Sequence, residues 1–283
     1  MLLTVVQHAL RGLERQHEDM PEGDTVWRTA QRLHNALAGE TLTRSDFRVP
    51  AFATSDLSGR KVLEVVPRGK HLLARIEGDL TLHTHLRMEG AWRVYSRPSR
   101  WRGGPSWQIR LILSTDTIDA VGYRLPVVEL LPTAREADVV GHIGPDLLDP
   151  AFDKETALQR LRERPDQQIG PALLDQRNLA GIGNLYKAET LFVCRVSPWS
   201  RVGDVADLGR IVEEGRRLLM SNRERPEQST TGDLRRGFRH FVFERERLPC
   251  RRCGSPVMSR RQGQPPRDRI TYWCATCQPS DNS

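Results

Sequence analysis

The sequence predicts a multidomain protein of the α+β class, and three observations lead to this prediction. After a first helix, short apolar or alternating runs follow one another from residue 61 without helical patterns between them, which is typical of an antiparallel β-sandwich. Residues 150–245 carry helical periodicity instead. Two Cys-x-x-Cys pairs close the chain and predict a small metal-bound hairpin. We therefore expect domains over residues 21–140, 141–243 and 244–279.

The predicted N-terminal domain begins at an unusual stretch, HEDMPEGDTVWRTAQRLHNALAG, residues 17–39. A methionine stands directly before Pro-Glu-Gly-Asp, and a helix follows. The strands of the sandwich come next, separated by Gly, Pro or Asp. Residues 96–106, SRPSRWRGGPS, read as an exposed loop. The clearest strand runs are 61–67, 71–77, 80–86, 91–96 and 107–114, with further runs after Thr117.

The middle domain is predicted from helical spacing. Residues 152–165 place apolar side chains at helical intervals and stop at Pro165, and residues 204–222 form a longer amphipathic run. Between them lies the turn AGIGN, residues 180–184. Its glycines let backbone N–H groups face an anion at a helix start, and Asn184 adds a side-chain donor. The same turn also fits an ordinary helix–helix connection.

Four of the five cysteines form the predicted finger. Two knuckles about 20 residues apart offer four thiolates, the ligand set of a tetrahedral Zn²⁺ site, and leave no open position for catalysis. Disulfides are the alternative, and a cytosolic chain disfavours them. A β-hairpin is expected between the knuckles, with strands at 257–258 and 270–273. Cys194 reads as an inert core residue. The predicted zinc ligands are Cys250, Cys253, Cys274 and Cys277.

The charge of the chain is concentrated at its C-terminal end. Residues 235–283 hold eleven arginines against four acidic residues, a surplus equal to the +7 of the whole chain. This indicates a polyanionic partner, because neutralised phosphates release counterions. A solvated arginine-rich tail is the alternative. No apolar run is long enough to span a bilayer, and the first residues lack the features of a secretory signal. We therefore expect a cytoplasmic protein without a membrane partner.

Several motifs occur in an order that resembles the formamidopyrimidine-DNA glycosylase and endonuclease VIII family of base-excision repair enzymes. The resemblance extends from Pro21 to Gln278 and implies a helix and β-sandwich, a helix–two-turn–helix domain and a zinc finger. It rests on PEGDTV after a methionine, RGKHLL at 68–73, LTLHTHLRMEG at 80–90, HIGPDLL at 142–148, DQRNLAGIGNLYKAETLF at 175–192 and the C-terminal RITYWCATCQ.

The resemblance implies a catalytic group of three residues. Pro21, freed by removal of a methionine, matches the nucleophile that attacks C1′ of a damaged nucleotide, expels the base and allows β-elimination to nick the strand. Such an amine must be unprotonated, and an α-amino pKa of about 8 leaves a useful neutral fraction at neutral pH. Glu22 matches the acid that assists ring opening. Lys70 matches the lysine that contacts phosphate near the lesion.

Three further residues match DNA contacts of the family. Asn184 and Arg269 correspond to its phosphate clamps, and Met88 to the residue that fills the gap left by an extruded base. Each match has a simpler interpretation. Glu22 also suits the positive start of a helix, Lys70 a protein surface, Met88 a core, and Arg269 one finger arginine among several.

The resemblance also implies a substrate class. The formamidopyrimidine branch carries an Arg-Arg-Phe-Gly loop after the sandwich strands, but residues 120–131 here read AVGYRLPVVELL. HLRMEG and the PEG opening resemble endonuclease VIII more closely. These differences favour oxidised pyrimidines as the substrate. The expected partner is damaged DNA, double-stranded or single-stranded. We expect the protein to be a monomer with one structural zinc.

The segment before Pro21 decides between two functions. With residues 1–20 attached, the nitrogen of Pro21 is a tertiary amide whose lone pair is delocalised, so it cannot form an iminium. We expect translation to begin at Met20, which makes residues 1–20 a non-native extension. The alternative is a binder of damaged DNA with little or no lyase activity.

Overall fold

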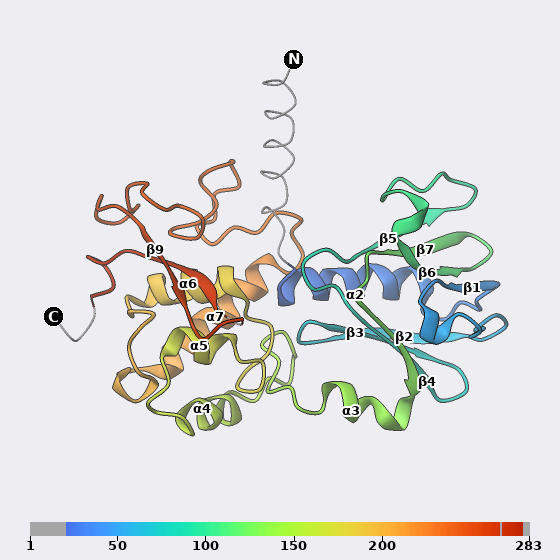
Figure 1. The fold of residues 1–283 in the computed structure, drawn as a ribbon, viewed down its shortest axis with the longest axis horizontal. Helices are drawn as coiled ribbons and strands as arrows, with labels where there is room; N and C mark the ends of the chain where they lie inside the picture. The colour runs from blue at the N-terminus through green and yellow to red at the C-terminus, as the bar shows by residue number, and fades with distance from the viewer. Residues whose placement is uncertain (1–20, 267, 280–283) are drawn as a thin grey trace, which may run out of the picture.

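The computed structural model describes residues 21–266 and 268–279. Two lobes lie side by side along the longest axis, a β-sandwich and a helical lobe that carries the C-terminal hairpin (Figure 1). Helix α2 (Gly23–Leu37) begins near the junction of the lobes and runs into the sandwich. Val26, Leu33 and Leu37 form its buried face. The predicted α+β architecture is confirmed.

The sandwich consists of two four-stranded antiparallel sheets. Five of the predicted strand runs match observed strands. A short edge strand, β1, was not predicted, because its sequence RSDF is half exposed and does not alternate. One sheet has the order β1 (Arg44–Phe47), β6 (Ile109–Ser114), β7 (Ile118–Tyr123) and β5 (Ala91–Ser96). The other has the order β2 (Val62–Arg68), β3 (His71–Ile76), β4 (Leu80–His85) and β8 (Val127–Pro132).

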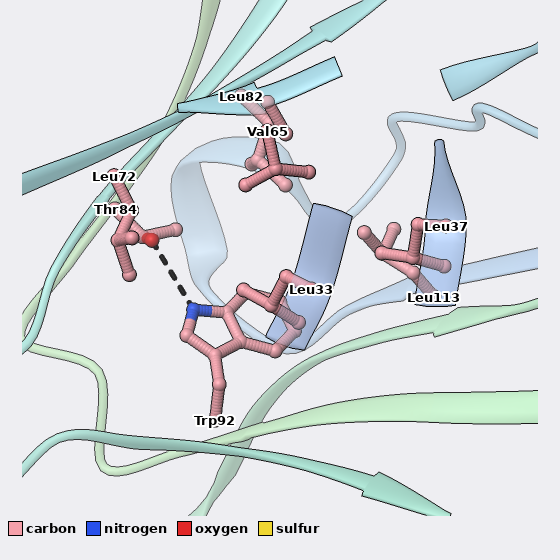
Figure 2. A pocket seen from close by; sticks show the side chains of 9 residues that line it. Leu33, Leu37, Val65, Leu72, Leu82, Thr84, Trp92 and Leu113 are labelled. Atoms are coloured by element: carbon pink, nitrogen blue, oxygen red, sulfur yellow. Dashed lines mark hydrogen bonds between the residues drawn. The ribbon is translucent and has the colours of Figure 1, made fainter. Parts of the chain in front are cut away.

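Helix α2 fills the space between the sheets with apolar side chains. A small cavity remains beside it, lined by leucines, Val65, Ala74 and Trp92 (Figure 2). The indole Nε1 of Trp92 donates to Thr84 Oγ1 at 3.2 Å, so the one polar group of this ring is satisfied. The lining is otherwise apolar, and the cavity is an imperfectly filled core, unrelated to the polar site described below.

The helical lobe follows a short connection. Asp153 caps α4 by accepting from Thr156 N at 3.0 Å, and Asp207 caps α7 by accepting from Arg210 N at 2.8 Å. Both amphipathic runs are therefore confirmed as helices. The connection holds η3 (Thr133–Arg135) and α3 (Glu136–Val140), and the lobe holds α4 (Lys154–Arg162), α5 (Ile169–Leu174), α6 (Asn184–Cys194) and α7 (Leu208–Asn222). Three other 3₁₀ turns are η1 (Pro50–Phe52), η2 (Ser106–Gln108) and η4 (Val202–Asp204).

The helical prediction is wrong for the last part of its range. Residues 223–245 form turns without helix. Pro and Gly interrupt this stretch, and the buried carboxylate of Glu189 on α6 replaces the missing backbone partners. It accepts backbone N–H groups from residues 241–243 at 2.7–2.8 Å and the hydroxyl of Thr230. A single helical carboxylate thus organises the segment that leads to the finger.

The C-terminal hairpin consists of β9 (Met258–Gln262) and β10 (Arg269–Trp273), which pair antiparallel. β10 packs on α6, and the buried side chain of Gln262 donates to the carbonyl of Pro198 at 2.7 Å. The hairpin is therefore joined to the helical lobe by both packing and hydrogen bonds. Within the described ranges, no helix has the length and apolar character needed to cross a membrane.

Candidate active site at the junction of the lobes

The buried carboxylate of Glu22 joins the first helix to the AGIGN turn. It accepts the backbone N–H groups of Gly183 and Leu185, each at 2.8 Å, and that of Tyr186 at 3.4 Å. These are the unpaired donors at the start of α6, where the helix dipole favours negative charge. The anion expected at this turn is thus the protein's own Glu22. Glu22 caps α6 and makes no side-chain cap to α2, its own helix.

The protonation of Glu22 is set by opposing effects. Burial raises the pKa of its carboxyl to about 7, and the negative charge of Asp24 adds to this, while Lys70 and the backbone N–H groups of Gly183 and Leu185 lower it. Burial outweighs the combined attraction. A carboxyl group with a pKa near 7 can both give and take a proton at neutral pH, as a general acid–base must.

Asp24 follows Glu22 by two residues and is fully buried. Its Oδ2 accepts the hydroxyl of Tyr186 at 2.7 Å, and the amide of Gln228 donates to both oxygens at 2.9 Å. Burial raises the pKa of this carboxyl, although the bonds from Gln228 and Tyr186 lower it. Asp24 therefore connects α2, α6 and the segment after α7 behind the candidate acid.

Lys70 occupies the turn between β2 and β3. The turn is held by Asp146, whose Oδ2 accepts from Gly69 N at 2.6 Å and whose Oδ1 accepts from Leu148 N at 2.9 Å. The RGKHLL and HIGPDLL motifs are thus joined directly. Burial of the amine lowers the pKa of Lys70, the charges of Glu22 and Asp24 oppose this, and Arg269 adds to it. The charge of Lys70 therefore interacts with the carboxylate of Glu22 and with Arg269 of the finger.

Asn184 and the finger are linked by a lysine that the sequence reasoning missed. Asn184 Nδ2 donates to the carbonyl of Ile270 at 2.8 Å. Lys187, buried one turn later on α6, donates to Asn184 Oδ1 and to Thr271 Oγ1, both at 2.7 Å. Burial lowers the pKa of Lys187 to about 7, with Glu22 opposing the shift and Arg269 adding to it. The only signal in the sequence was a lysine spaced three residues from Asn184.

Met88 and Arg269 are both exposed. Met88 is 62% exposed in the β4–β5 loop, whereas its neighbour Leu86 is buried, so the interpretation of Met88 as core is wrong. The loop is shaped by two hydrogen bonds, from Arg87 N to His85 Nδ1 at 2.9 Å and from Gly90 N to the carbonyl of Leu86 at 2.8 Å. Arg269 begins β10, and its side chain makes one local bond, to the carbonyl of Asp268.

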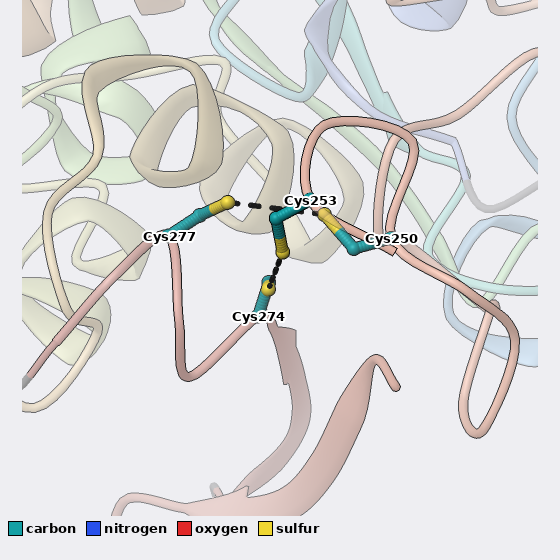
Figure 3. Close-up of side chains that lie close together, drawn as sticks. All are labelled: Cys250, Cys253, Cys274 and Cys277. Carbon is teal, nitrogen blue, oxygen red and sulfur yellow. Dashed lines mark hydrogen bonds between the residues drawn. The ribbon is translucent and has the colours of Figure 1, made fainter. Parts of the chain in front are cut away.

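The four predicted cysteine ligands converge on one point (Figure 3). Their sulfur atoms all lie within 4.8 Å of one another. Cys250 and Cys277 are 3.9 Å apart and Cys253 and Cys274 are 3.4 Å apart, far longer than the ~2.05 Å of a disulfide. Four sulfurs at ~2.3 Å from a central ion would lie slightly under 4 Å from each other. The cluster therefore fits a tetrahedral metal, and the predicted disulfide alternative is wrong for these cysteines.

Glu22, Lys70 and the basic finger thus come together where the two lobes join. Comparison with known proteins gives the class. Residues 20–124 match the family model of the formamidopyrimidine-DNA glycosylase N-terminal domain, and residues 143–213 match that of the formamidopyrimidine-DNA glycosylase H2TH domain.

Relatives are similar over nearly the whole chain. A "Probable endonuclease 8 2" of Streptomyces coelicolor is 58% identical, over 92% of this chain and 94% of its own. The "DNA-(apurinic or apyrimidinic site) lyase Nei2" of Mycolicibacterium smegmatis is 45% identical, over 92% of this chain and 99% of its own. The chain therefore belongs to the formamidopyrimidine-DNA glycosylase and endonuclease VIII family, and it is a DNA glycosylase and lyase of base-excision repair.

Solved structures share the fold. The crystal structure of Lactococcus lactis Fpg in a complex with DNA containing N7-benzyl-Fapy-dG superimposes with a TM-score of 0.76 at 22% identity, and it covers 92% of this chain and all of that one. The resemblance found in the sequence motifs is confirmed.

The electrostatics of Glu22 yield a first prediction. Because the negative charge of Asp24 raises the pKa of Glu22, Asp24→Asn should move that pKa below 7, so the carboxylate persists to lower pH. Carbon-13 NMR titration of the glutamate carboxyls measures this directly. Asp46→Asn, which alters an exposed ion pair on β1, is the matched control. An unchanged Glu22 midpoint in Asp24→Asn would contradict the electrostatic account.

Proposed function

We propose that the chain, when Pro21 is its first residue, removes oxidised bases, preferentially pyrimidines, through a covalent intermediate on Pro21 and then nicks the strand. The observation that carries this proposal is the position of Glu22. Pro21 stands directly before a buried carboxyl group whose pKa is about 7, and Lys70 lies within electrostatic reach of that carboxyl. A nucleophile, an acid–base and a phosphate-binding cation are thus adjacent.

The proposed chemistry balances with these groups. The neutral secondary amine of Pro21 attacks C1′ and the glycosidic bond breaks. The amine nitrogen loses its proton, and the departing base takes up one. Glu22 protonates the ring oxygen as the sugar opens and an iminium forms between Pro21 and C1′. Loss of a proton from C2′ then expels the 3′ phosphate. Water hydrolyses the iminium and frees the amine.

Catalysis in this form requires a free N-terminal amine. Residues 1–20 lie outside the described part of the chain, and an amide at Pro21 has no lone pair to donate. We propose that the active form starts at Pro21 after removal of Met20. A chain that retains the preceding residues would bind damaged DNA without forming the covalent intermediate.

The proposed DNA contacts come from three elements. One N–H of the Asn184 amide is bonded to Ile270, and the second N–H of that group is available for a phosphate. Arg269 supplies an exposed guanidinium beside it, and Met88 an exposed apolar side chain on a short loop. These features support a phosphate clamp and a wedge that fills the space of an extruded nucleotide.

The proposed preference for pyrimidines is supported by residues 120–131. This stretch ends β7 and starts β8 across a short connection, without the Arg-Arg-Phe-Gly sequence. The relatives cited above carry endonuclease 8 or lyase names. The same proposal includes a monomer that acts in the cytoplasm, on the chromosome.

Zinc is the proposed structural metal. Cys250, Cys253, Cys274 and Cys277 would hold it as thiolates, and it would fix the base of the hairpin that carries Arg269. The domain boundaries expected after residues 140 and 243 are part of the proposal, with the finger as the last unit.

The covalent step can be tested by trapping. Chains that start at Met1 and at Pro21, each verified by intact mass, are mixed with abasic-site DNA and borohydride, which reduces an iminium to a stable amine. We expect an adduct with the shorter chain alone. DNA binding by both chains with an adduct from neither would establish the non-catalytic alternative instead.

The phosphate clamp predicts a salt effect. Arg269→Ala should weaken binding to duplexes of different sequence alike, and it should reduce the slope of log Kd against log salt by about one unit. Fluorescence anisotropy over a salt series measures both. Arg261→Ala, which removes a guanidinium already paired with Asp268, is the control and should change the slope less. Equal slopes in Arg269→Ala and the parent would disprove the contact.

The metal proposal predicts a link between binding and folding of the finger. Cys274→Ser should lose the zinc found by atomic absorption and lower the thermal midpoint, because metal binding stabilises the folded finger. Cys194→Ser changes the cysteine outside the cluster and should keep its zinc. Full zinc content in Cys274→Ser would exclude the site.

A further inference from the structure

The β5–β6 connection, residues 97–108, is an arginine-rich loop to which the proposed reaction gives no role. Its sequence, RPSRWRGGPSWQ, holds three arginines and no acidic residue. In the view of Figure 1 this loop projects upward from the sandwich, and the turns between α7 and β9 project upward from the helical lobe. Both projections therefore rise on the same side of α2, whose start lies at the junction of the lobes.

The arginine-rich loop is anchored to the sandwich by its middle residues. The indole Nε1 of Trp101 donates to the buried carboxylate of Asp119 at 3.0 Å, and its ring packs on a cluster of buried residues from β6 and β7. Gly103 approaches the same cluster so closely that a Cβ there would lie 2.4 Å from the ring of Tyr123. The loop that the sequence predicts to be exposed thus has one face fixed against the sheet.

Trp107, in η2 at the end of the loop, is held through its backbone. Nη1 of Arg110 donates to the carbonyl of Trp107 at 2.9 Å, and Nη1 of Arg48 donates to the carbonyl of Ser106 at 3.3 Å. The side chain of Trp107 is nevertheless 72% exposed. Tryptophan is enriched at binding interfaces, because its ring offers a large contact area and loses little conformational freedom. This ring is therefore a candidate for a contact with a partner.

Two arginines of the loop carry charge that the protein itself does not neutralise. Arg100 and Arg102 are both exposed, and among the described residues neither guanidinium has a hydrogen-bond or ion-pair partner. Arg97 differs, because it donates to the carbonyl of Thr115 at 2.8 Å and lies 3.7 Å from the carboxylate of Asp119. Unpaired guanidiniums and an exposed indole in one loop suit a strand of nucleic acid, which offers phosphates and base faces.

Arg124 joins the arginine-rich loop to the loop that carries Met88. Arg124 lies in the β7–β8 connection, and its backbone N–H donates to the carbonyl of Gln108 at 2.7 Å. Its side chain donates through Nη1 to Gln108 Oε1 and through Nε to the carbonyl of Glu89 at 3.0 Å. Glu89 directly follows Met88 in the β4–β5 loop. The arginine-rich loop therefore borders the element that we propose as the wedge in the DNA.

We propose that residues 97–108 form a second DNA-binding element, in which Arg100 and Arg102 bind phosphates away from the lesion and Trp107 stacks on an unpaired base. The bases of a duplex are already stacked on both faces, so the indole requires DNA that is locally single-stranded. Damaged DNA with unpaired bases is therefore the substrate class that this loop favours. The inference rests on the proposed function, because it takes Met88 to contact the DNA.

The stacking contact is tested with two DNAs that differ only in pairing. Both carry a tetrahydrofuran abasic-site analogue, and in one of them the bases around the analogue are mismatched into a bubble. In the Pro21-initiated chain, Trp107→Ala should weaken binding to the bubble at least about fivefold and change binding to the duplex little. Trp107→Phe retains an aromatic ring and should keep most of the bubble affinity. Leu63→Ala truncates an exposed apolar side chain of the other sheet and is the control.

The phosphate contacts are tested by salt and by the length of the DNA. The double variant Arg100→Ala/Arg102→Ala should lower the slope of log Kd against log salt by about two units on either DNA. The charge-matched control is Arg44→Ala/Arg135→Ala, which removes two exposed arginines that already pair with aspartates and should lower the slope less. Because the proposed contacts lie away from the lesion, the affinity difference between the loop variant and the parent should disappear as the flanks of the duplex are shortened.

The outcomes separate this inference from the proposed function. Equal bubble affinities of Trp107→Ala and Leu63→Ala, or equal salt slopes of the double loop variant and its control, overturn the second DNA-binding element. A loss of affinity that persists on the shortest flanks overturns its position away from the lesion. Borohydride trapping by the parent chain does not depend on the loop, so a trapped adduct with unchanged affinities removes the loop contact alone. A bubble-specific loss in Trp107→Ala without trapping by the parent removes the covalent chemistry and leaves the loop contact standing.

Discussion

The contact between the Glu22 carboxylate and the start of α6 is the constraint on which the junction of the two lobes depends. It requires the N-terminus of α2 to approach the AGIGN turn so closely that side chains are excluded. A Cβ on Gly183 would lie 2.4 Å from the Glu22 carboxyl carbon, and one on Gly23 would lie 2.8 Å from the Cα of Gly181. The backbone N–H of Gly23 donates to the carbonyl of Gly181 at 2.9 Å and completes the contact. Gly183 is therefore explained by the approach of the Glu22 carboxylate, and Gly23 by the approach of the Gly181 backbone.

The helical lobe contains a second buried carboxylate that accepts backbone N–H groups from a segment distant in sequence. Glu189, on the same helix as the N–H groups that bind Glu22, accepts three backbone N–H groups from residues 241–243 and holds the path to the finger. Lys187, which precedes Glu189 on the same helix, donates to Thr271 Oγ1 in strand β10 of the finger. One helix thus presents its N-terminus to the first lobe, an amine to the hairpin and a carboxylate to the loop before the hairpin. A displacement of α6 would move the acid, Asn184 and the basic finger together, so the geometry of the site depends on this helix.

Local patterns in the sequence predict most of the helices, strands and metal ligands, but they do not predict features that depend on contacts between distant segments. The sandwich strands, α4, α7 and the cysteine cluster follow from period-2, helical and Cys-x-x-Cys spacing, which are local signals. β1 is missed because four residues at a sheet edge need no alternation. The turns at 223–245 are missed because Glu189, distant in sequence, supplies the hydrogen bonds that a helix would otherwise provide. Asn184, Lys70 and Arg269 are predicted from separate motifs, but the hydrogen bond from Asn184 to the finger and the interaction of Lys70 with Arg269 arise only from the fold. Lys187 lies within the motif at 175–192, but its role could not be predicted, because it arises from burial and from a partner on the distant strand β10.

Burial of charge at the junction costs stability, and the same burial produces the reactivity. Raising the pKa of Glu22 from 4.5 to about 7 means that its ionised form is disfavoured by about 3 kcal/mol, although Lys70 and the N–H groups of Gly183 and Leu185 favour that form. Fully solvated, the carboxyl would remain ionised at neutral pH and could donate no proton. The lysines respond to the same environment in the opposite sense, because desolvation disfavours their cationic forms and lowers the pKa of Lys70 and of Lys187. The mutual attraction between Glu22 and these amines limits both shifts. The pKa of the acid is therefore raised toward neutral pH, and the pKa values of the amines are lowered toward it. A site of this kind exchanges protons readily at pH 7, and an arriving phosphate, which favours protonated forms, would shift all of these groups in the same direction.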